Sequence, residues 1–478
     1  MTAPELHALL PYMVLAATAV LVLLGIAARR SHALALSLSL LGLAGALAAM
    51  AYGNWRGAPQ PVTGLIVVDP LATVFLGLTL LATAVVALLA AGYLQRQSIQ
   101  REEFYVLLLT AALGAATLAA SSHFASLFLS LELLSVSLYG LIAYQYDRPL
   151  NLEAGIKYLV LAGVTSAFLL FGVALLYSQT GDLRLPGGAA PGALTGSVTP
   201  VYLLGVLMVL VGIGFKLALV PFHMWSPDIY QGAPAPVAAF LATVSKAGVF
   251  ALLLRCFLTD RLAEHASLYA VFVTVAIVSM LAGNLLALLQ TNVKRLLGYS
   301  SIAHLGYLLV PVVGGGEAAV GIAVFFLVAY FVTMLAAFGV VATLSGANRD
   351  AAEFHEYQGL AWQHPWLAAV LTAALMSLAG IPVTAGFMGK AYLVAVGAAA
   401  GEWVLLLTLV VGSAISLYYY LRTITVMFGP MPELRAEPLT PPRPVLAGLV
   451  LGALLLLLLA LGAYPAPALA MLLALTGR

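Results

Sequence analysis

The sequence predicts an all-α polytopic membrane protein, and three observations predict it: few charges, high hydropathy and apolar runs of membrane-spanning length. Asp, Glu, Lys and Arg make up 8% of the 478 residues, against ~25% in soluble domains. Hydrophobic residues make up 63%, and the mean hydropathy is +1.07. In water such a chain would expose one large apolar patch, which excludes a soluble enzyme, a nucleic-acid binder and a disordered protein.

Fourteen apolar windows approach or exceed the roughly 20 residues that a membrane-spanning helix needs. They lie near 9–28, 33–52, 71–93, 104–120, 124–143, 155–177, 202–231, 235–258, 269–289, 297–313, 319–345, 365–400, 403–426 and 445–464. The first window lacks a basic leader and a small-residue cleavage site, so we expect a membrane helix there rather than a signal peptide.

The seventh and twelfth windows are too long for one span, and each contains an internal proline, Pro221 and Pro382. Proline breaks a helix because it removes a backbone hydrogen bond. Non-helical backbone at membrane depth is tolerated only inside protein or beside a wet cavity. A lone proline would indicate an ordinary kink, but two breaks, each with a lysine close by, favour a transport site between repeats.

The connections between the windows are short and carry no recognisable catalytic motif. The stretch 178–201 is rich in Gly, Pro, Ser and Thr and is predicted to be a turn-rich outer loop. The stretch 429–444 has six prolines and is predicted to be a stiff cytoplasmic linker. The tail 465–478 is typical of a short interfacial helix.

Orientation follows from Lys and Arg, which accumulate in cytoplasmic loops. Eleven lie on one side of the predicted topology and five on the other. The larger group comprises Arg29, Arg30, Arg96, Arg101, Arg148, Lys294, Arg295, Arg349, Arg422, Arg435 and Arg443. We therefore expect that side to be cytoplasmic and both termini to face outward.

The five lysines are distributed differently from the fifteen arginines. Lys157, Lys216, Lys246 and Lys390 fall within predicted spans, whereas every arginine lies in a loop or near a helix end. Arginine stays protonated almost anywhere, whereas a buried lysine can gain and lose a proton. This distribution favours lysines that take part in proton transfer over fixed structural charges.

Glu132 is the only acidic residue predicted in the middle of a span. An isolated ionised carboxylate there would cost several kcal/mol, so it should neutralise or find a cation. Lys216 is the favoured partner, followed by Lys157 and Lys246, and a merely structural ion pair is the alternative. Asp69 and Asp228 lie at span ends and are interpreted as solvated.

His304 lies at membrane depth, and imidazole titrates near neutrality. A proton relay and a hydrogen bond between packed helices are both open for His304, while His223 after Pro221 is interpreted as structural. Hydroxyls near the charges, Ser135 and Tyr158 among them, could order water. They more often hold helices together by hydrogen bonds.

No bound cofactor or metal is expected in this chain. The single Cys256 excludes a disulfide framework and a cysteine-ligated cluster or zinc site. The sequence shows no strand followed by a phosphate loop and no H-E-x-x-H spacing. With a net charge of +2 there is no bulk field to attract nucleic acid. Energy for transport must then come from an ion gradient or from partner subunits.

Four motifs resemble the antiporter-like subunits of respiratory complex I. They are the run 132–140 (Glu-Leu-Leu-Ser-Val-Ser-Leu-Tyr-Gly), Lys216 with 221–225 (Pro-Phe-His-Met-Trp), the run 293–302, and the Gly-Ile-Pro break at 380–382 before Lys390. Within that family, the loop 226–237 with its Tyr-Gln-Gly-Ala-Pro sequence and the lysine at position 246 indicate one particular branch.

The resemblance implies two inverted five-helix repeats, helices 4–8 at 104–258 and helices 9–13 at 269–426. Residues 1–103 would form helices 1–3, and 427–478 the linker and last helix. It assigns Glu132 and Lys216 to an interacting pair, Lys246 to a central link and Lys390 to a second half-channel. Lys157 and His304 would be additional relay positions.

The resemblance also implies a proton-translocating translocase subunit in a bacterial inner membrane, with both termini periplasmic. Its partners would be other membrane-arm subunits of NADH-quinone oxidoreductase, protons, internal water and lipids, and no nucleic acid. FMN, the iron–sulfur clusters and the quinone pocket would belong to partner subunits. The alternatives are a subunit of a multisubunit Na⁺/H⁺ antiporter, a subunit of a membrane-bound hydrogenase, or a non-pumping structural subunit.

Overall fold

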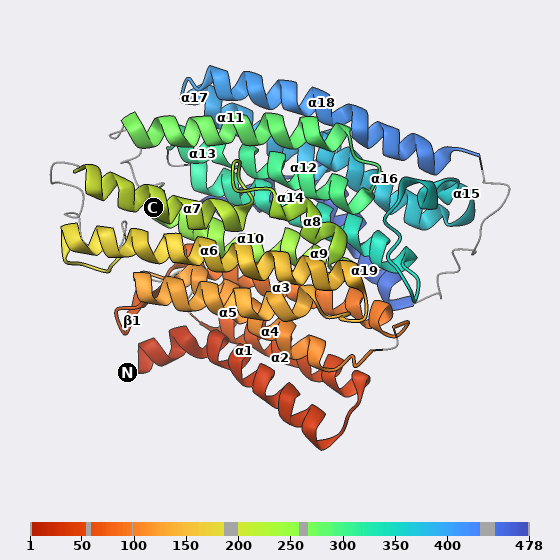
Figure 1. Ribbon diagram of the computed structural model, residues 1–478, viewed down its shortest axis with the longest axis horizontal. Helices are drawn as coiled ribbons and strands as arrows, with labels where there is room; N and C mark the ends of the chain where they lie inside the picture. The colour runs from red at the N-terminus through yellow and green to blue at the C-terminus, as the bar shows by residue number, and fades with distance from the viewer. Residues whose placement is uncertain are drawn as a thin grey trace. The chain divides into compact units, whose positions relative to one another are not determined.

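Helices form most of the described part of the chain in the computed structural model, which describes residues 2–53, 59–97, 99–185, 199–257, 266–316, 318–430 and 445–476. The elements follow in the order α1 (Ala3–Ala28), α2 (His32–Tyr52), β1 (Gln60–Val62), β2 (Ile66–Val68), α3 (Pro70–Leu94), α4 (Glu103–Ala120), α5 (Phe124–Ile142), α6 (Pro149–Thr180), α7 (Pro200–Leu217), α8 (Trp225–Gly232), α9 (Ala235–Ala242), α10 (Val244–Phe257), α11 (Ala266–Leu288), α12 (Val293–Tyr307), α13 (Leu309–Gly314), α14 (Ala319–Leu344), η1 (Phe354–Tyr357), α15 (Leu360–Gln363), α16 (Pro365–Ala379), α17 (Ala385–Ala399), α18 (Trp403–Phe428), α19 (Val445–Ala463) and α20 (Ala466–Thr476) (Figure 1).

The predicted spans are confirmed as helices. Within the described residues, 13 helices are long and apolar enough to cross a membrane. The twelfth window is divided into the shorter helices α16 and α17, and the seventh into α7 and α8. Two further breaks were not predicted, one at Thr243 between α9 and α10 and one at Leu308 between α12 and α13.

A small hairpin corrects the expectation of a chain without strands. β1 and β2 pair antiparallel, with Gln60 opposite Val68 and Val62 opposite Ile66. Strands of three residues are too short to show the alternation that identifies a strand in a sequence. The tail does form a helix, α20. The predicted linker 429–444 and outer loop 178–201 lie mostly outside the described residues.

The chain divides into two units, each described here by itself. Unit 1 comprises Met1–Ala84, Arg101–Trp225 and Val244–Ala266, and in it α1 packs on α2, α4 on α5, and α6 on α7. Unit 2 comprises Val85–Gln100, Ser226–Thr243 and Ser267–Arg478. The centre of unit 2 is α14. In its apolar stretch of membrane-spanning length, 94% of the residues are buried.

One close helix contact occurs in both units at matching positions. In unit 1, a Cβ on Gly114 of α4 would lie 2.6 Å from the backbone nitrogen of Leu134 on α5. In unit 2, a Cβ on Gly283 of α11 would lie 2.6 Å from the backbone nitrogen of Ala303 on α12. The separation is 169 residues in both cases (283 minus 114 and 303 minus 134). This correspondence supports an internal repeat, in which the position after Leu134, Ser135, matches His304.

Candidate functional site

Both predicted helix breaks lie where the prolines are. α7 ends at Leu217, four residues before Pro221, whose missing N–H could not have bonded the Leu217 carbonyl in a continued helix. Ala218 then turns the chain with φ of 58°. α16 ends at Ala379, and Gly380 turns the chain with φ of 86° before Pro382. Glycine suits that conformation because it has no Cβ.

Lys216, in the last turn of α7, is buried with 2% exposure. Its Nζ donates to Ser135 Oγ at 2.7 Å and to Tyr158 OH at 3.3 Å. The ammonium also lies 5.0 Å from the centroid of the Tyr158 ring. Trp225 packs against that ring and donates its indole N–H to the Phe215 carbonyl at 2.8 Å, which ties the residues after the break to α7. The direct partners of Lys216 are therefore neutral hydroxyls and aromatic rings.

The expected direct ion pair between Glu132 and Lys216 is not formed among the described residues. The Glu132 carboxylate instead accepts a hydrogen bond from Ser166 Oγ of α6 at 2.6 Å. Glu132 is partly exposed, whereas Ser135, nearly one helical turn further along α5, is fully buried and faces Lys216. Ser135 and Tyr158 are the contact residues that the sequence interpretation assigned to helix packing.

The other two lysines of unit 1 lie in very different surroundings. Lys246 is fully buried on α10, just after the break at Thr243. Lys157 has a side chain that is 43% exposed and forms an ion pair with Glu153 at 2.7 Å on the same helix. The structure thus places Lys246 in the protein interior and Lys157 on an outer face of α6.

His304 is buried on α12 in unit 2, among aromatic rings. Its Nδ1 lies 2.9 Å from the Ser300 carbonyl, which can only accept, so Nδ1 carries the hydrogen. The His304 ring packs against those of Tyr307, Phe326 and Tyr330. This arrangement indicates the tautomer with its hydrogen on Nδ1.

Lys390 of α17 binds the broken end of α16. Its Nζ donates to the Leu378 carbonyl at 2.9 Å and to the Ala379 carbonyl at 3.0 Å. Leu378 is four residues before Pro382, so no backbone N–H is available for its carbonyl. The buried ammonium therefore replaces the hydrogen bonds that the helix break removes.

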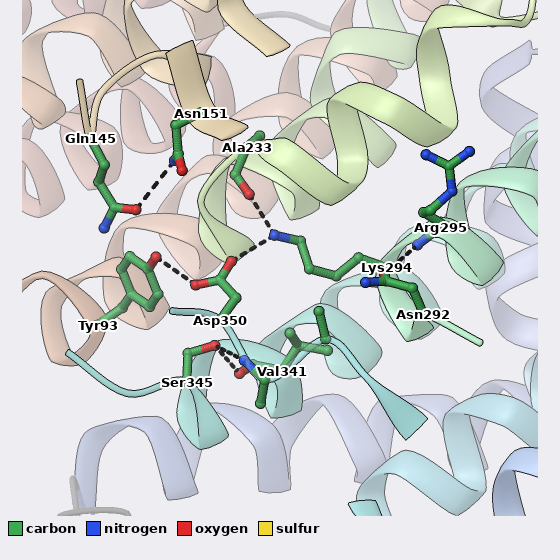
Figure 2. Close-up of polar contacts among 12 residues, drawn as sticks. Tyr93, Gln145, Asn151, Ala233, Asn292, Lys294, Arg295, Val341, Ser345 and Asp350 are labelled. Atoms are coloured by element: carbon green, nitrogen blue, oxygen red, sulfur yellow. Dashed lines mark hydrogen bonds and ion pairs between the residues drawn. The ribbon is translucent and has the colours of Figure 1, made fainter. Parts of the chain in front are cut away.

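A second buried lysine of unit 2, which sequence reasoning assigned to a loop, lies at the start of α12. Lys294 is 1% exposed and forms an ion pair with Asp350 at 2.6 Å (Figure 2). Its Nζ also donates to the Ala233 carbonyl at 2.6 Å, and Tyr93 OH donates to the other Asp350 oxygen at 2.7 Å. Four segments of unit 2 are thus joined at one buried charge pair.

Two acids interpreted as solvated are in fact bound to arginine. Asp69 holds Arg255 through two hydrogen bonds of 2.8 and 3.0 Å, and both side chains are nearly buried. Asp228 of α8 accepts from Arg295 at 2.6 Å. Asp69 is nearly buried because a helix from elsewhere in the chain packs against it, whereas Asp228 stays partly exposed, and sequence spacing carries no signal for either pairing.

A first prediction concerns Ser135→Ala, which removes the Lys216 acceptor at 2.7 Å. A hydrogen bond to a charged group contributes ~1.5–3 kcal/mol. We expect the rate of proton uptake by proteoliposomes that contain the assembled protein to fall roughly tenfold. The control is Ser178→Ala, whose hydroxyl donates only to the Leu175 carbonyl on the exposed end of α6. Equal rates in both variants would contradict a role for Ser135.

Two interrupted membrane helices, each with a buried lysine at its break, define an antiporter-type membrane subunit. The comparisons with known proteins agree. The family model described as NADH:quinone oxidoreductase/Mrp antiporter, transmembrane, matches residues 121–416. NADH-quinone oxidoreductase subunit N of Methylococcus capsulatus is 48% identical over 98% of this chain and 94% of its own length.

Two further comparisons cover nearly the whole chain. Subunit N of Chromohalobacter salexigens is 49% identical over 97% of both chains. A chain in the structure of respiratory complex I from Thermus thermophilus superposes with a TM-score of 0.83 at 35% identity, and the match covers 97% of this chain and 99% of that one. The chain belongs to the family of NADH-quinone oxidoreductase subunit N.

Proposed function

We propose that this chain moves protons through the buried residues Lys216, Lys246, His304 and Lys390, within the membrane arm of NADH-quinone oxidoreductase. Its family membership makes it a proton-translocating, multi-pass membrane subunit of that complex in a bacterial membrane. The observation that supports the route is the pair of breaks. Each places a buried lysine against neutral oxygens rather than against a carboxylate.

Neutral partners suit a group that must both hold and release a proton. The Ser135 and Tyr158 hydroxyls can hydrogen-bond either the ammonium or the amine form of Lys216, since a hydroxyl both donates and accepts. A carboxylate in direct contact would favour the ammonium alone. Glu132 therefore acts on Lys216 without touching it. A rearrangement that changes their interaction by ~1.4 kcal/mol alters the ratio of the two forms tenfold.

In the proposed sequence of events, quinone chemistry in partner subunits weakens the influence of Glu132 on Lys216. Lys216 then passes its proton through internal water and Lys246 toward His304 and Lys390. FMN, the iron–sulfur clusters and the quinone pocket lie in those partners. Lys157, exposed on α6 and paired with Glu153, lies outside the buried route, and we propose it as an accessory relay position whose loss the route largely tolerates.

We further propose that the membrane is the inner membrane, with both termini on its periplasmic side. In unit 2, Arg96 donates to the Thr343 and Ser345 carbonyls, while Lys294 pairs with Asp350. These contacts place two of the basic residues that the sequence assigns to the cytoplasmic side, Arg96 and Lys294, near the segment that follows α14, which supports one basic end of the unit.

The experiment is purification of the particle through an affinity tag on this chain. We expect NADH-dehydrogenase and quinone-site subunits to co-purify, and the reconstituted particle to take up protons when given NADH and a quinone. Cation-antiporter or hydrogenase subunits in their place would contradict the proposal. A structural subunit predicts a different outcome: variants with neutralised lysines would lower the yield of complex without changing turnover per assembled complex.

A further inference from the structure

A buried hydrogen-bonded chain of three side chains from different helices lies beside Lys390 in unit 2. Asn284 of α11 donates from Nδ2 to Tyr307 OH of α12 at 2.9 Å and to the Met280 carbonyl at 2.7 Å. Tyr419 OH of α18 donates to the Asn284 Oδ1 at 2.9 Å. Asn284, Tyr307 and Tyr419 are at most 1% exposed. Because both amide protons and the amide oxygen are used, Asn284 is held in one orientation.

The Tyr307 ring, held by this chain at its hydroxyl, presents its face to Lys390. The ammonium nitrogen lies 5.3 Å from the ring centroid. Its hydrogen bonds go to the Leu378 and Ala379 carbonyls, which accept but cannot take up a proton. An aromatic face attracts an ammonium but not a neutral amine. The Tyr307 ring therefore distinguishes the charged from the uncharged form of Lys390 without exchanging a proton with it.

A glycine of α18 leaves room for the hydrogen bond between Asn284 and Tyr307. At Gly412 a Cβ would lie 2.7 Å from Asn284 Nδ2 and 2.9 Å from Tyr307 OH. Any other residue at this position would push the amide and the hydroxyl apart. Tyr307 also packs against His304, with ring centroids 5.4 Å apart. Tyr307 thus contacts both titratable groups of unit 2 that the proposed route uses.

We propose that Asn284 and Tyr307 are positioning residues for Lys390: Asn284 fixes the Tyr307 ring, and the ring holds the Lys390 ammonium at the break between α16 and α17. This inference rests on the proposed function, because it assigns a purpose to the charge state of Lys390. It adds to the residues that act on the proton path Asn284 of α11, a helix without a charged residue, and Tyr307 of α12. A role in packing alone would make the ring interchangeable with an aliphatic side chain of similar size.

The test uses the whole complex in proteoliposomes and measures NADH-driven proton uptake per assembled particle. Four variants are compared: Lys390→Met, Tyr307→Leu, Tyr307→Phe and the double variant Lys390→Met with Tyr307→Leu. We expect Tyr307→Leu to lower the uptake rate roughly tenfold, as loss of a desolvated cation–π contact does. Tyr307→Phe keeps the ring face but loses the hydrogen bond from Asn284, so its rate should lie between those of Tyr307→Leu and the wild type. The double variant should be no slower than Lys390→Met, because the two residues act through one interaction.

Three outcomes would overturn the inference: Tyr307→Leu at the wild-type rate, Tyr307→Phe as slow as Tyr307→Leu, or losses that multiply in the double variant. Lys390→Met at the wild-type rate would instead contradict the proposed function itself, so the two failures are distinguishable. Should Tyr307→Leu not assemble, Gly412→Ala separates the amide from the hydroxyl and leaves both residues in place. We expect Gly412→Ala to lower uptake more than Gly448→Ala, where a Cβ meets nothing within 4 Å. Equal rates would overturn the inference.

Discussion

Lys216→Met should lower NADH-driven proton uptake by the reconstituted complex roughly a hundredfold, the factor that a positioned proton-transfer group contributes. Methionine has nearly the length of lysine but has no titratable amine. The space beside Ser135 and Tyr158 therefore stays filled, while the group that would carry the proton is lost. Lys216→Arg should lower uptake as severely, because arginine retains the charge but does not release its proton in proteins. The arginine variant therefore separates proton transfer from fixed structural charge.

Lys157→Met is the comparison variant, because it makes the same change in the same unit. Lys157 is exposed and bound to Glu153 on its own helix. We expect a much smaller loss than for Lys216→Met, since an exposed ion pair contributes ~0–1 kcal/mol. Assembly is checked by the amount of complex recovered per cell. Wild-type uptake in Lys216→Arg would contradict the mechanism, because it would show that Lys216 need not lose its proton.

Asp350→Asn should destabilise the protein by ~3–5 kcal/mol, the cost of leaving a buried charge without its partner. The asparagine can still accept from Tyr93 OH, but the 1% exposed Lys294 loses its counter-ion. Four segments meet at this pair, so we expect the complex to assemble poorly and to dissociate at a lower temperature. The measurement is the midpoint of thermal dissociation in detergent.

Two variants make the Asp350 prediction specific. Glu103→Gln breaks an ion pair with Arg30 in which the two side chains are 35% and 55% exposed, and it should shift the midpoint little. The double change Lys294→Met with Asp350→Leu should recover much of the stability, because it removes both buried charges together. No recovery in the double variant would show that the cluster acts through the shape of its side chains rather than through charge.

Much of the fold follows from composition and local pattern. Apolar windows located the membrane helices, because a helix in lipid must satisfy its own backbone and present apolar side chains. The breaks at Pro221 and Pro382 were predictable because proline acts through its own ring and missing N–H. The hairpin β1–β2 and the interruption at Thr243 were not, because three-residue strands and a single threonine carry no clear pattern. The break at Leu308 did carry a signal, which the sequence prediction missed: α12 ends at Tyr307, four residues before Pro311.

The candidate site, like the fold, could be predicted from the sequence only in part. Sequence reasoning placed four lysines within spans, and the structure buries three of them, Lys216, Lys246 and Lys390, but leaves Lys157 exposed. It also buries Lys294, which was expected in a loop.

Sequence reasoning could not place the partners of the buried lysines. Lys216 contacts Ser135 rather than Glu132 because α5 turns Ser135 toward the lysine and because Glu132 accepts a hydrogen bond from Ser166. Such contacts depend on how two helices face each other.

The sequence by itself determined that this chain lies in a membrane, that two of its helices break at prolines, and that Lys216, Lys246 and Lys390 are buried. These three predictions rest on the free energy of moving side chains and backbone groups from water into lipid, to which each residue contributes separately. Only the tertiary structure decided what each charge touches: hydroxyls for Lys216, the orphaned carbonyls of α16 for Lys390, and Asp350 for Lys294. Those contacts join residues far apart in the chain, and their energies depend on distances of a few ångströms that no local pattern specifies.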